Sequence, residues 1–182
     1  MTYRTLQSLF GQIIPFYVKN DNYLYFLNYL QLMTKVFSLS KSVIDRNVEN
    51  KSGVYQIRCY NKGKPLVIRR LCNKDKLGIL YIGSRIHINR RLKEFIKGIN
   101  NESREHPSGY RYYILELDKK RFLEKDNLMF SLQYCDDYKE EEARLLMGYT
   151  DYFGELPPLN SQDINEDYEN LKLRKYKKEF NW

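Results

Sequence analysis

The stretch Gly53-Val54-Tyr55-Gln56-Ile57-Arg58-Cys59 decides the fold, together with Ile79-Leu80-Tyr81-Ile82-Gly83 further along the chain. Both stretches are short, rich in β-branched and aromatic residues, and bounded by residues that favour turns, which is typical of β-strands. A glycine opens the first stretch and another closes the second, where a neighbouring backbone or a ligand must approach closely. We expect two adjacent antiparallel strands that bring Tyr55 and Tyr81 together.

The rest of the pattern adds one more main strand and two amphipathic helices. Residues 128–135 form a strand-like run. Apolar residues recur at helical spacing in 88–99 and again in 140–153, where Gly154 can end the helix. Residues 110–117 are rich in tyrosine and fit either a helix or a strand. These elements predict an α/β protein of the α+β type, with a small antiparallel sheet flanked by helices.

The chain divides into three regions. Residues 1–48 predict a helical N-terminal extension, whose second helix runs from Tyr23 to about Ser38. That helix is apolar on most sides, so it must be buried against the core or against a second subunit. Residues 52–162 form the core, and residues 163–182 form a charged C-terminal tail.

Composition bounds the class of protein. Hydrophobic residues make up 42% of the 182 residues, which is enough for a packed core. The formal net charge of +8 and the pI near 9.2 suit a polyanionic partner, because Lys and Arg attract phosphate and release counterions. Three scattered cysteines and two histidines argue against a zinc site, and with no signal-peptide pattern they predict a cytoplasmic protein. The longest apolar stretch without charge, 22–34, is too short to span a bilayer, so we expect no membrane partner.

Helical phase separates two neighbouring arginines. The helix over 88–99 advances by about 100° per residue, and its apolar residues form one stripe. Arg91 lies at the edge of this stripe and can lean over the strands, whereas Arg90 lies almost opposite and points to solvent or to a partner. Arg91 is therefore the candidate for chemistry, with a solvated helix arginine as the alternative.

The same count separates three consecutive glutamates in the helix over 140–153. Glu142 projects near the centre of the apolar stripe, Glu141 to one side and Glu140 to the far side. A carboxylate on an apolar face is costly unless it is paired or bound to a metal. Glu142 is therefore the candidate metal ligand and Glu141 the second choice, while a buried Glu–Arg pair is the alternative reading.

The core resembles the GIY-YIG nuclease family, whose members cut phosphodiester bonds with tyrosines, an arginine and one metal-holding glutamate. The resemblance spans about residues 52–162 and rests on an ordered set: Gly53-Val54-Tyr55, Tyr81-Ile82-Gly83, Arg91 ten residues after Tyr81, Glu142 and Asn160. It implies that Tyr55 receives or relays the proton of the attacking water and that Tyr81 orients water or phosphate. It further implies that Arg91 neutralises charge on the phosphoryl group and that Glu142 holds Mg²⁺ or another divalent cation such as Mn²⁺. A phenol has a pKa of about 10, so base action by Tyr55 requires a nearby cation.

Two further positions resemble the family, and one departs from it. His106, in His-Pro-Ser-Gly, resembles a histidine that implies protonation or positioning of a leaving group, with an exposed loop histidine as the alternative. Asn160 resembles the family's C-terminal asparagine, which braces the site, with an Asx-type turn as the alternative. Phe95 stands where another family pattern has a histidine, so that function is missing or supplied elsewhere.

The insert between the two tripeptides is longer than is common in the family. Twenty-five residues lie between Tyr55 and Tyr81, and many of them are basic. We expect an extended hairpin arm that contacts DNA, with a solvated basic loop as the alternative. Neighbouring Arg69 and Arg70 would point to opposite faces of a strand, so only one would face DNA and the other would lie on the outer face or pair with an acid. The residues expected to bind DNA are Arg69, Arg70, Arg85, Arg90, Lys93 and Arg111.

Together these features predict a metal-dependent endonuclease acting on double-stranded DNA, closest in form to a sequence-specific type II restriction endonuclease. Homing and repair enzymes of the family carry further reading domains, and they are the alternatives, with a catalytically inactive DNA-binding protein on the same fold as a third. A subunit with one site cuts two strands most simply as a homodimer, and the apolar N-terminal helices are the candidate dimer surface.

Overall fold

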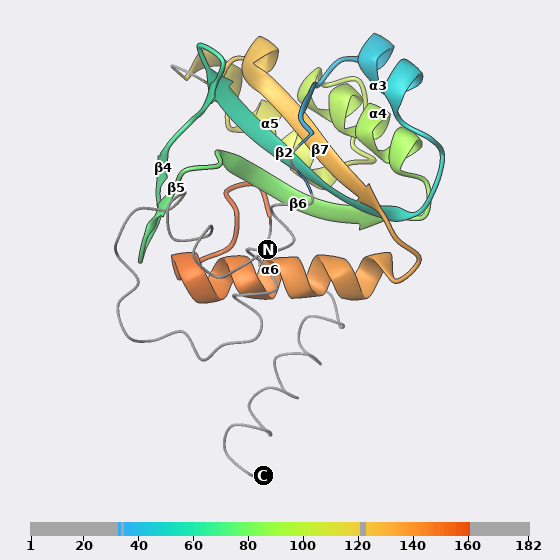
Figure 1. Cartoon of the computed structure of the whole chain (residues 1–182). Coiled ribbons are helices and arrows are strands. Elements are labelled where there is room, and N and C mark those ends of the chain that lie inside the picture. Colours follow the sequence, from blue (N-terminus) through green and yellow to red (C-terminus); the bar gives the residue numbers. More distant parts are fainter. Residues whose placement is uncertain (1–32, 34, 121–122, 161–182) are drawn as a thin grey trace, which may run out of the picture.

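The computed structural model describes residue 33, residues 35–120 and residues 123–160. Over these ranges the chain is a mixed α/β protein of the α+β type, with a small antiparallel sheet and helices on both of its faces (Figure 1). The first predicted N-terminal helix and the charged tail 163–182 lie outside the described residues.

The sheet is built around strand β2 (Gly53–Asn61). On one side β2 pairs with β7 (Leu128–Tyr134), and on the other it pairs with β6 (Ile79–Arg85). The short strand β1 (Phe37–Ser38) pairs with β7, and β3 (Lys64–Pro65) pairs with the end of β2. All of these pairings are antiparallel, so the prediction of two adjacent antiparallel strands at the centre of the fold is confirmed.

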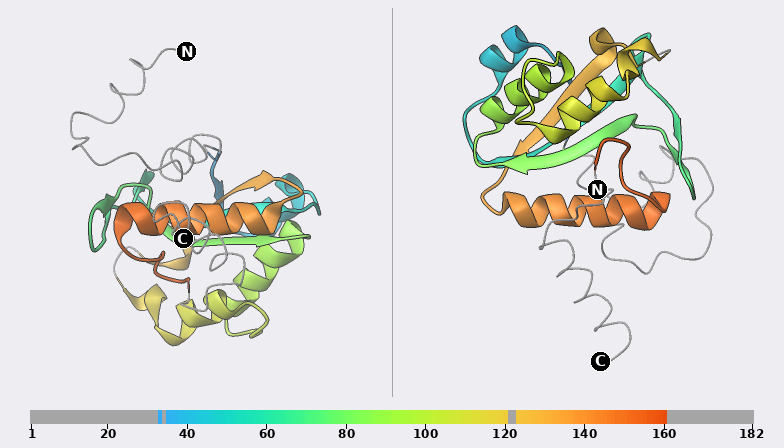
Figure 2. Two further views of the ribbon diagram at one scale, coloured as in Figure 1. Left: turned by 90° about the horizontal axis from the view of Figure 1, so that it is seen from below. Right: turned by 180° about the vertical axis from the view of Figure 1, so that it is seen from behind.

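Helices cover the sheet on both sides (Figure 2). Helices α3 (Lys41–Asn47), α4 (Ile88–Ile99) and α5 (Pro107–Ile114) pack on one face, and α6 (Tyr138–Phe153) lies on the other. Two short 3₁₀ turns follow α5: η1 at Leu117–Lys119 and η2 at Lys125–Asn127.

The predicted arm is present as a small separate hairpin. Strand β4 (Ile68–Arg69) pairs only with β5 (Lys74–Asp75), and the hairpin reaches away from the sheet toward the C-terminal end of α6 (Figure 1). The buried carboxylate of Asp75 accepts hydrogen bonds from the backbone N–H groups of Leu77, Gly78 and Ile79. These bonds fix the turn that leads from the arm into β6.

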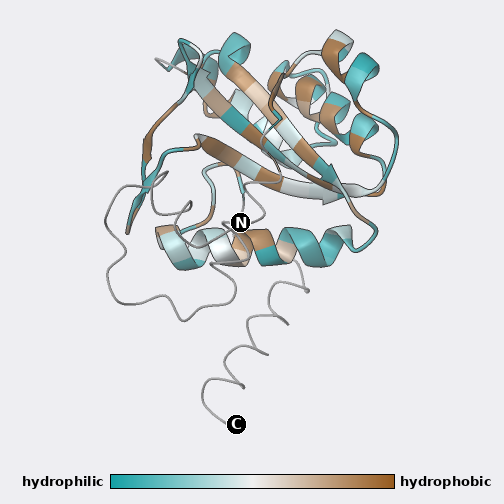
Figure 3. Cartoon of the chain, in the orientation of Figure 1, coloured by the Kyte–Doolittle hydropathy of each residue, from teal (hydrophilic) through white to brown (hydrophobic). Residues whose placement is uncertain are grey.

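The central strand is buried on both faces because successive side chains alternate between two cores. Tyr55 and Ile57 face α4 and α5, whereas Val54 packs with α6. Apolar residues are concentrated on the strands and on the inner sides of the helices, while polar residues cover the outer turns (Figure 3). The two cores therefore hold β6, which carries Tyr81, in place between opposite layers of helix.

Several predicted boundaries are confirmed. Helix α4 has the predicted bounds, and α6 ends at Gly154, whose φ of +79° is the left-handed conformation that glycine adopts easily. The ambiguous segment 110–117 is helical in its first half, because α5 starts with Pro107 and its first turn is capped by the His106 side chain. Among the residues that the structure describes, no helix is both long and apolar enough to cross a membrane.

The end of the predicted second helix is wrong. Phe37 and Ser38 form β1, in register with Phe130 and Met129, and the Phe37 ring stacks on Phe130 at a centroid distance of 5.3 Å. Pairing with the open edge of β7 outweighs the local helical spacing. Of the earlier part of this helix, the structure describes only Met33, Lys35 and Val36, and none of them is helical.

The helix that follows β1 belongs to the core. In and around α3, Leu39, Ile44 and Val48 are buried in the same cluster as Tyr55 and Tyr81. The described residues of region 1–48 from Phe37 onward therefore pack as part of the core.

Candidate active site

A cavity of about 520 Å³ opens where the end of β6, the first turns of α4 and the start of α6 meet. Four residues that sequence analysis selected line it: Arg85, Arg90, Arg91 and Glu142. The remaining lining residues are Ser84, Ile86, His87, Glu94, Tyr138 and Lys139. The fold thus brings cations and carboxylates from three separate segments to one concave surface.

Of the three consecutive glutamates in α6, only Glu142 lines the cavity. Its Oε2 accepts a hydrogen bond of 2.6 Å from Ser84 Oγ on β6. Glu140 and Glu141 accept instead from the guanidinium of Arg144, at 2.7 and 3.4 Å. The helical phase that favoured Glu142 over Glu141 is therefore the phase seen in α6.

A metal site here would depend on this single carboxylate. No group of three or more His, Cys, Asp or Glu side chains able to hold a metal occurs among residues 35–120 and 123–160. Mg²⁺ keeps several of its waters and is commonly held by one or two carboxylates together with substrate phosphate oxygens. The hard oxygen donor of Glu142, held by Ser84 at the cavity wall, fits a cation of that kind, whereas an all-protein cage is not formed.

Arg91 and Arg90 share one buried partner but differ in exposure. The Arg91 side chain is 15% exposed and the Arg90 side chain is 74% exposed. Arg91 Nη1 donates to Glu94 Oε2 and to the carbonyl oxygen of Glu105, both at 3.0 Å, and Arg90 Nε donates to Glu94 Oε1 at 2.8 Å. A guanidinium has five N–H donors, so Arg91 keeps donors for a phosphate after these bonds are made.

The electrostatics of this trio favour a fixed arginine. Burial alone raises the pKa of Glu94, but hydrogen bonds and charge from Arg91 and Arg90 outweigh it and hold the pKa below its usual range. Burial lowers the pKa of Arg91, and the neighbouring Tyr55, Glu94 and Tyr81 raise it above its ordinary value. The cation and its carboxylate partner therefore both stay charged at neutral pH.

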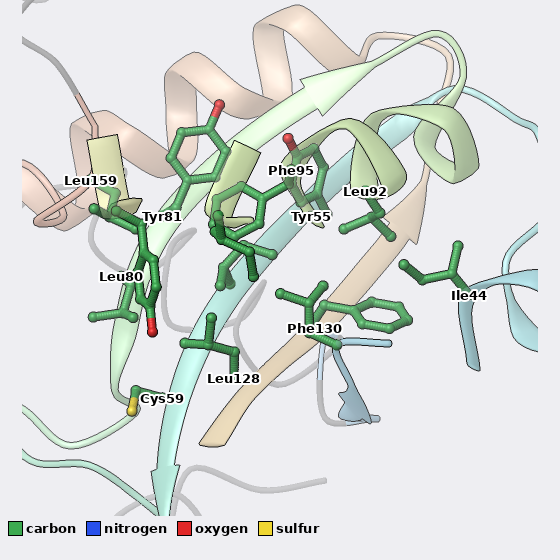
Figure 4. Close-up of a cluster of buried hydrophobic side chains, with 14 of the residues drawn as sticks. Ile44, Tyr55, Cys59, Leu80, Tyr81, Leu92, Phe95, Leu128, Phe130 and Leu159 are labelled. Carbon is green, nitrogen blue, oxygen red and sulfur yellow. The ribbon is translucent and has the colours of Figure 1, made fainter. Parts of the chain in front are cut away.

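Tyr55 and Tyr81 lie diagonally across the β2–β6 pair. Tyr55 is opposite Gly83 and Tyr81 is opposite Ile57, and the two ring centroids are 5.8 Å apart. Figure 4 shows both phenols with Phe95 between the sheet and α4, their oxygens directed to the same side. A Cβ atom on Gly83 would lie 2.6 Å from Tyr81 Oη, so only glycine leaves room for this ring.

Neither phenol lines the cavity, because Tyr55 is fully buried and Tyr81 is 8% exposed. Burial raises the pKa of Tyr55 well above its usual value, and the nearby Arg91 charge, which lowers it, does not compensate. Burial also raises the pKa of Tyr81 despite the same cation. The cation that base action requires is therefore present, but burial keeps both phenols protonated at neutral pH in this conformation.

His106 is buried, so the exposed-loop alternative is wrong. Its Nδ1 accepts from the Gly109 backbone N–H at 3.3 Å, and its Nε2 lies 2.8 Å from Tyr55 Oη. Burial and the Arg91 charge lower the pKa of the imidazole to about 2, so the ring is neutral. A neutral ring that accepts at Nδ1 carries its proton at Nε2 and donates it to Tyr55. His106 does not line the cavity, and its side chain contacts Tyr55.

Asn160 holds the outer edge of β6. Its Oδ1 accepts from the Ile82 N–H at 3.0 Å, and its Nδ2 donates to the Ile82 carbonyl at 2.8 Å. The Leu159 N–H donates to the Leu80 carbonyl at 2.8 Å, which extends this contact along the strand. The Asn160 side chain thus pairs with both backbone groups of Ile82, as a neighbouring strand would. This is the geometry expected of a residue that braces β6, and it differs from that of an Asx turn.

The two arginines of the arm point to opposite faces, as expected. The Arg70 side chain is 8% exposed; its guanidinium lies 3.3 Å from Glu155 Oε1, donates to the carbonyl of Leu156 and sits over the ring of Tyr149. Arg69 is exposed. Arg70 therefore attaches the arm to the end of α6, and Arg69 is the one left to meet a partner.

Two other cations expected to bind DNA instead make contacts with other residues of the protein. Lys93 forms an ion pair with Asp45 of α3, and Arg111 donates to the Leu159 carbonyl at 2.9 Å. Arg85 and Arg90 instead lie at the cavity. The expected DNA-binding set thus divides into cavity, arm and structural residues.

Sequence reasoning missed Ser84, Glu94, Tyr138 and Lys139. Glu94 lies three and four residues after the two arginines, a spacing that places it beside both on a helix and could have revealed it. Tyr138 and Lys139 lie one turn before Glu142, but the helix was expected to begin at Glu140. The bond between Ser84 and Glu142 joins distant segments and leaves no local signal.

Comparisons of the chain with protein-family models, with curated proteins and with solved structures gave no match. The chemistry therefore has to be inferred from the site itself. A fixed cation and a carboxylate able to hold a hard metal ion, both lining one cavity, can bind a phosphate diester and stabilise charge that develops on it.

Proposed function

We propose that this chain is a metal-dependent endonuclease that hydrolyses phosphodiester bonds of double-stranded DNA on a GIY-YIG-like core. The observation that carries the proposal is the convergence of Arg91 and Glu142 on one cavity. These residues come from helices on opposite faces of the sheet, and the strand between them carries Tyr81. The charges of Arg91 and Glu142 both shift the pKa values of Tyr55 and Tyr81, so the four groups are electrostatically coupled.

Each residue has a distinct role in this proposal. Glu142 would hold Mg²⁺ or Mn²⁺, which supplies charge neutralisation and a more acidic water when bound. Ser84 fixes the carboxylate in one orientation through its 2.6 Å bond. Arg91 binds a nonbridging phosphate oxygen with the donors that Glu94 and Glu105 leave over.

The phenols serve as ordered donors. Tyr55 accepts from His106 and is hydrogen-bonded to Tyr81, so its own proton is directed to Tyr81 Oη. The Tyr81 hydroxyl also interacts with the Ser108 hydroxyl, so a phosphate oxygen or the attacking water would compete with Ser108 for the Tyr81 proton. Tyr81 is the less buried of the two phenols but does not line the cavity, so in this proposal it would act on the substrate through an intervening water or after a local opening of the site.

The test is a cleavage assay with the full chain, Mg²⁺, and plasmid and phage DNA, followed by sequencing of the ends. Glu142→Gln should lower the cleavage rate by ~10²-fold or more while DNA binding survives, because one electrostatic stabiliser is lost. Glu141→Gln is the matched control and should cut normally, since Glu141 pairs with Arg144 outside the cavity. Equal rates for wild type and Glu142→Gln would refute the proposed chemistry.

The second candidate function is DNA binding without cleavage. The burial of both phenols favours it, because this conformation offers no free tyrosine base. Specific binding by the wild-type chain with no cleavage in Mg²⁺ or Mn²⁺ would select it.

The biological class and the oligomeric state can be tested with the same purified protein. Discrete fragments would indicate a restriction-type enzyme, and a smear would indicate nonspecific or structure-selective cutting. A homodimer, which we propose for cutting both strands, should give a doubled solution mass on DNA that carries a symmetric site.

A further inference from the structure

We propose that Arg85 and Lys139 form a second phosphate site beside the scissile position, with Tyr138 packing against the sugar and base between the two phosphates. This inference rests on the nuclease function proposed above. It gives a role to the cavity residues that the proposed function does not use. The ligand is a DNA nucleotide that flanks the cut.

Charge distribution within the cavity separates two groups of cations. Arg90 and Arg91 both bind Glu94, and Glu142 accepts from Ser84. Arg85 and Lys139 are exposed lining residues and make no ion pair with another residue of the described ranges. The cavity thus contains four Lys and Arg side chains and two carboxylates, and the cations without an acid partner are Arg85 and Lys139. A concave surface with this excess concentrates phosphate.

The geometry of α6 sets the distance between the two sites. Tyr138 and Lys139 precede Glu142 by four and three residues, so all three side chains lie on neighbouring positions of one helix face. One helical turn rises by about 5.4 Å, compared with an axial rise of about 3.4 Å per nucleotide of a DNA strand. A group held one turn away from Glu142 is therefore placed to meet the adjoining nucleotide and not the same phosphate.

The size and lining of the cavity fit more than a phosphate group. About 520 Å³ lies within the range of pockets that bury small organic ligands. Tyr138 is half-buried at the wall, and an aromatic ring at such a position can stack on a base or pack against a sugar without reading sequence. The ring suits a base or a sugar, and the cations suit phosphates. These groups alternate along a nucleic acid strand.

The experiment measures DNA binding by the full chain in Ca²⁺ over a range of salt concentrations. Arg85→Ala and Lys139→Ala should each lower the slope of log K against log salt by about 1, as expected for the loss of one phosphate contact. Lys97→Ala is the control, because Lys97 is exposed on α4 but lies outside the cavity lining. Tyr138→Leu should weaken binding at least about fivefold and Tyr138→Phe should not, since the ring and not the hydroxyl makes the contact.

Methylphosphonate substitution locates the site along the strand. An uncharged phosphate next to the cut should weaken binding by wild type but cause no further loss in the Arg85→Ala, Lys139→Ala double variant. If both single variants keep the wild-type salt slope, or if the methylphosphonate effect persists in the double variant, the second phosphate site is refuted. That outcome differs from failure of the proposed function, in which wild type neither binds nor cuts DNA and Glu142→Gln changes nothing.

Discussion

His106 Nε2 lies 2.8 Å from Tyr55 Oη, and the imidazole is the donor in this bond. The direction follows from the second ring nitrogen, which accepts from the Gly109 N–H at the start of α5. A buried neutral histidine thus ties the N-terminus of one helix to the central strand. It fixes which way the proton of Tyr55 points, although it touches no solvent.

The burial of His106 makes stability depend on pH, because burial and the Arg91 charge lower the pKa of the imidazole. The pKa of His106 falls from 6.5 to about 2 on folding, so between these values the unfolded chain binds a proton that the folded chain does not. Stability contributed by the neutral ring is intact above pH 6.5 and is lost as pH falls, by about 1.4 kcal/mol per unit at full effect. We expect urea denaturation to show the stability gap between wild type and His106→Gln narrowing from pH 7 to pH 5. A gap that stays constant with pH would show that His106 titrates normally in the folded protein.

Gly83→Ala should disturb the Tyr81 ring. The added Cβ would lie 2.5 Å from Cε1 and 2.6 Å from Oη of Tyr81, and this ring is held against Phe95 and His106. We expect a loss of roughly 1–3 kcal/mol of unfolding free energy from overpacking, together with a fall in cleavage rate. In a Tyr81→Ala background the same substitution should cost much less, and additive losses in thermal unfolding would contradict the contact.

Asn160→Asp should loosen the edge of β6. Aspartate keeps the acceptor for the Ile82 N–H but loses the donor to the Ile82 carbonyl and adds a charge at a half-buried site. We expect a loss of about 1–3 kcal/mol and faster amide exchange along β6 near Ile82. Asn100→Asp is the control, because the exposed Asn100 side chain accepts, among the described residues, only from the Lys125 ammonium, and it should leave β6 exchange unchanged.

The parts of the fold that the sequence predicts well are those decided by local periodicity. The bounds of α4 follow from one continuous apolar stripe, and that stripe also separates Arg91 from Arg90. The same argument selects Glu142. By contrast, Phe37 joins the sheet only because β7 offers an open edge more than ninety residues later in the chain, which no local pattern encodes.

The roles of polar residues were harder to predict than their positions. The tripeptides place Tyr55 and Tyr81, but the burial that raises both phenol pKa values arises from α4 and α5 packed over them. Arg70 and Lys93 are basic residues whose acidic partners, Glu155 and Asp45, lie on other elements. Charge counting along the sequence cannot distinguish such structural cations from those that meet a ligand.

Arg91 and Arg90 should differ in catalysis. Arg91→Ala removes the cation that leans over the strands, and we expect single-turnover cleavage to fall by ~10²-fold or more. Arg90→Ala should leave the chemical step intact and at most weaken DNA affinity, because its side chain is mostly in solvent. Arg91→Lys should recover only part of the rate, since an ammonium cannot reproduce the forked donors of a guanidinium. Equal losses for the two alanine variants would contradict the assignment.

The last prediction concerns the arm, where Arg69 and Arg70 are neighbours with different environments. Arg70→Ala removes a buried guanidinium that bonds the Leu156 carbonyl and lies over Tyr149, so the arm loses an attachment to the end of α6. We expect a lower thermal midpoint, corresponding to roughly 1–3 kcal/mol, because the half-buried Leu156 carbonyl is left without that donor. Arg69→Ala removes only an exposed side chain, so the thermal midpoint should not change.

The two variants should also differ in how they affect the choice of DNA cleavage site. If the arm reads bases, Arg69→Ala relaxes site preference by the ~1–3 kcal/mol that a bidentate contact to guanine contributes. Arg70→Ala should keep the wild-type preference at temperatures where it is folded, since its guanidinium faces the protein. Cleavage-site profiling of both variants on a randomised library measures this difference. An unchanged profile for Arg69→Ala would mean that the arm is a solvated loop and that sequence reading takes place elsewhere, with the segment from His106 to Tyr113 as the next region to test.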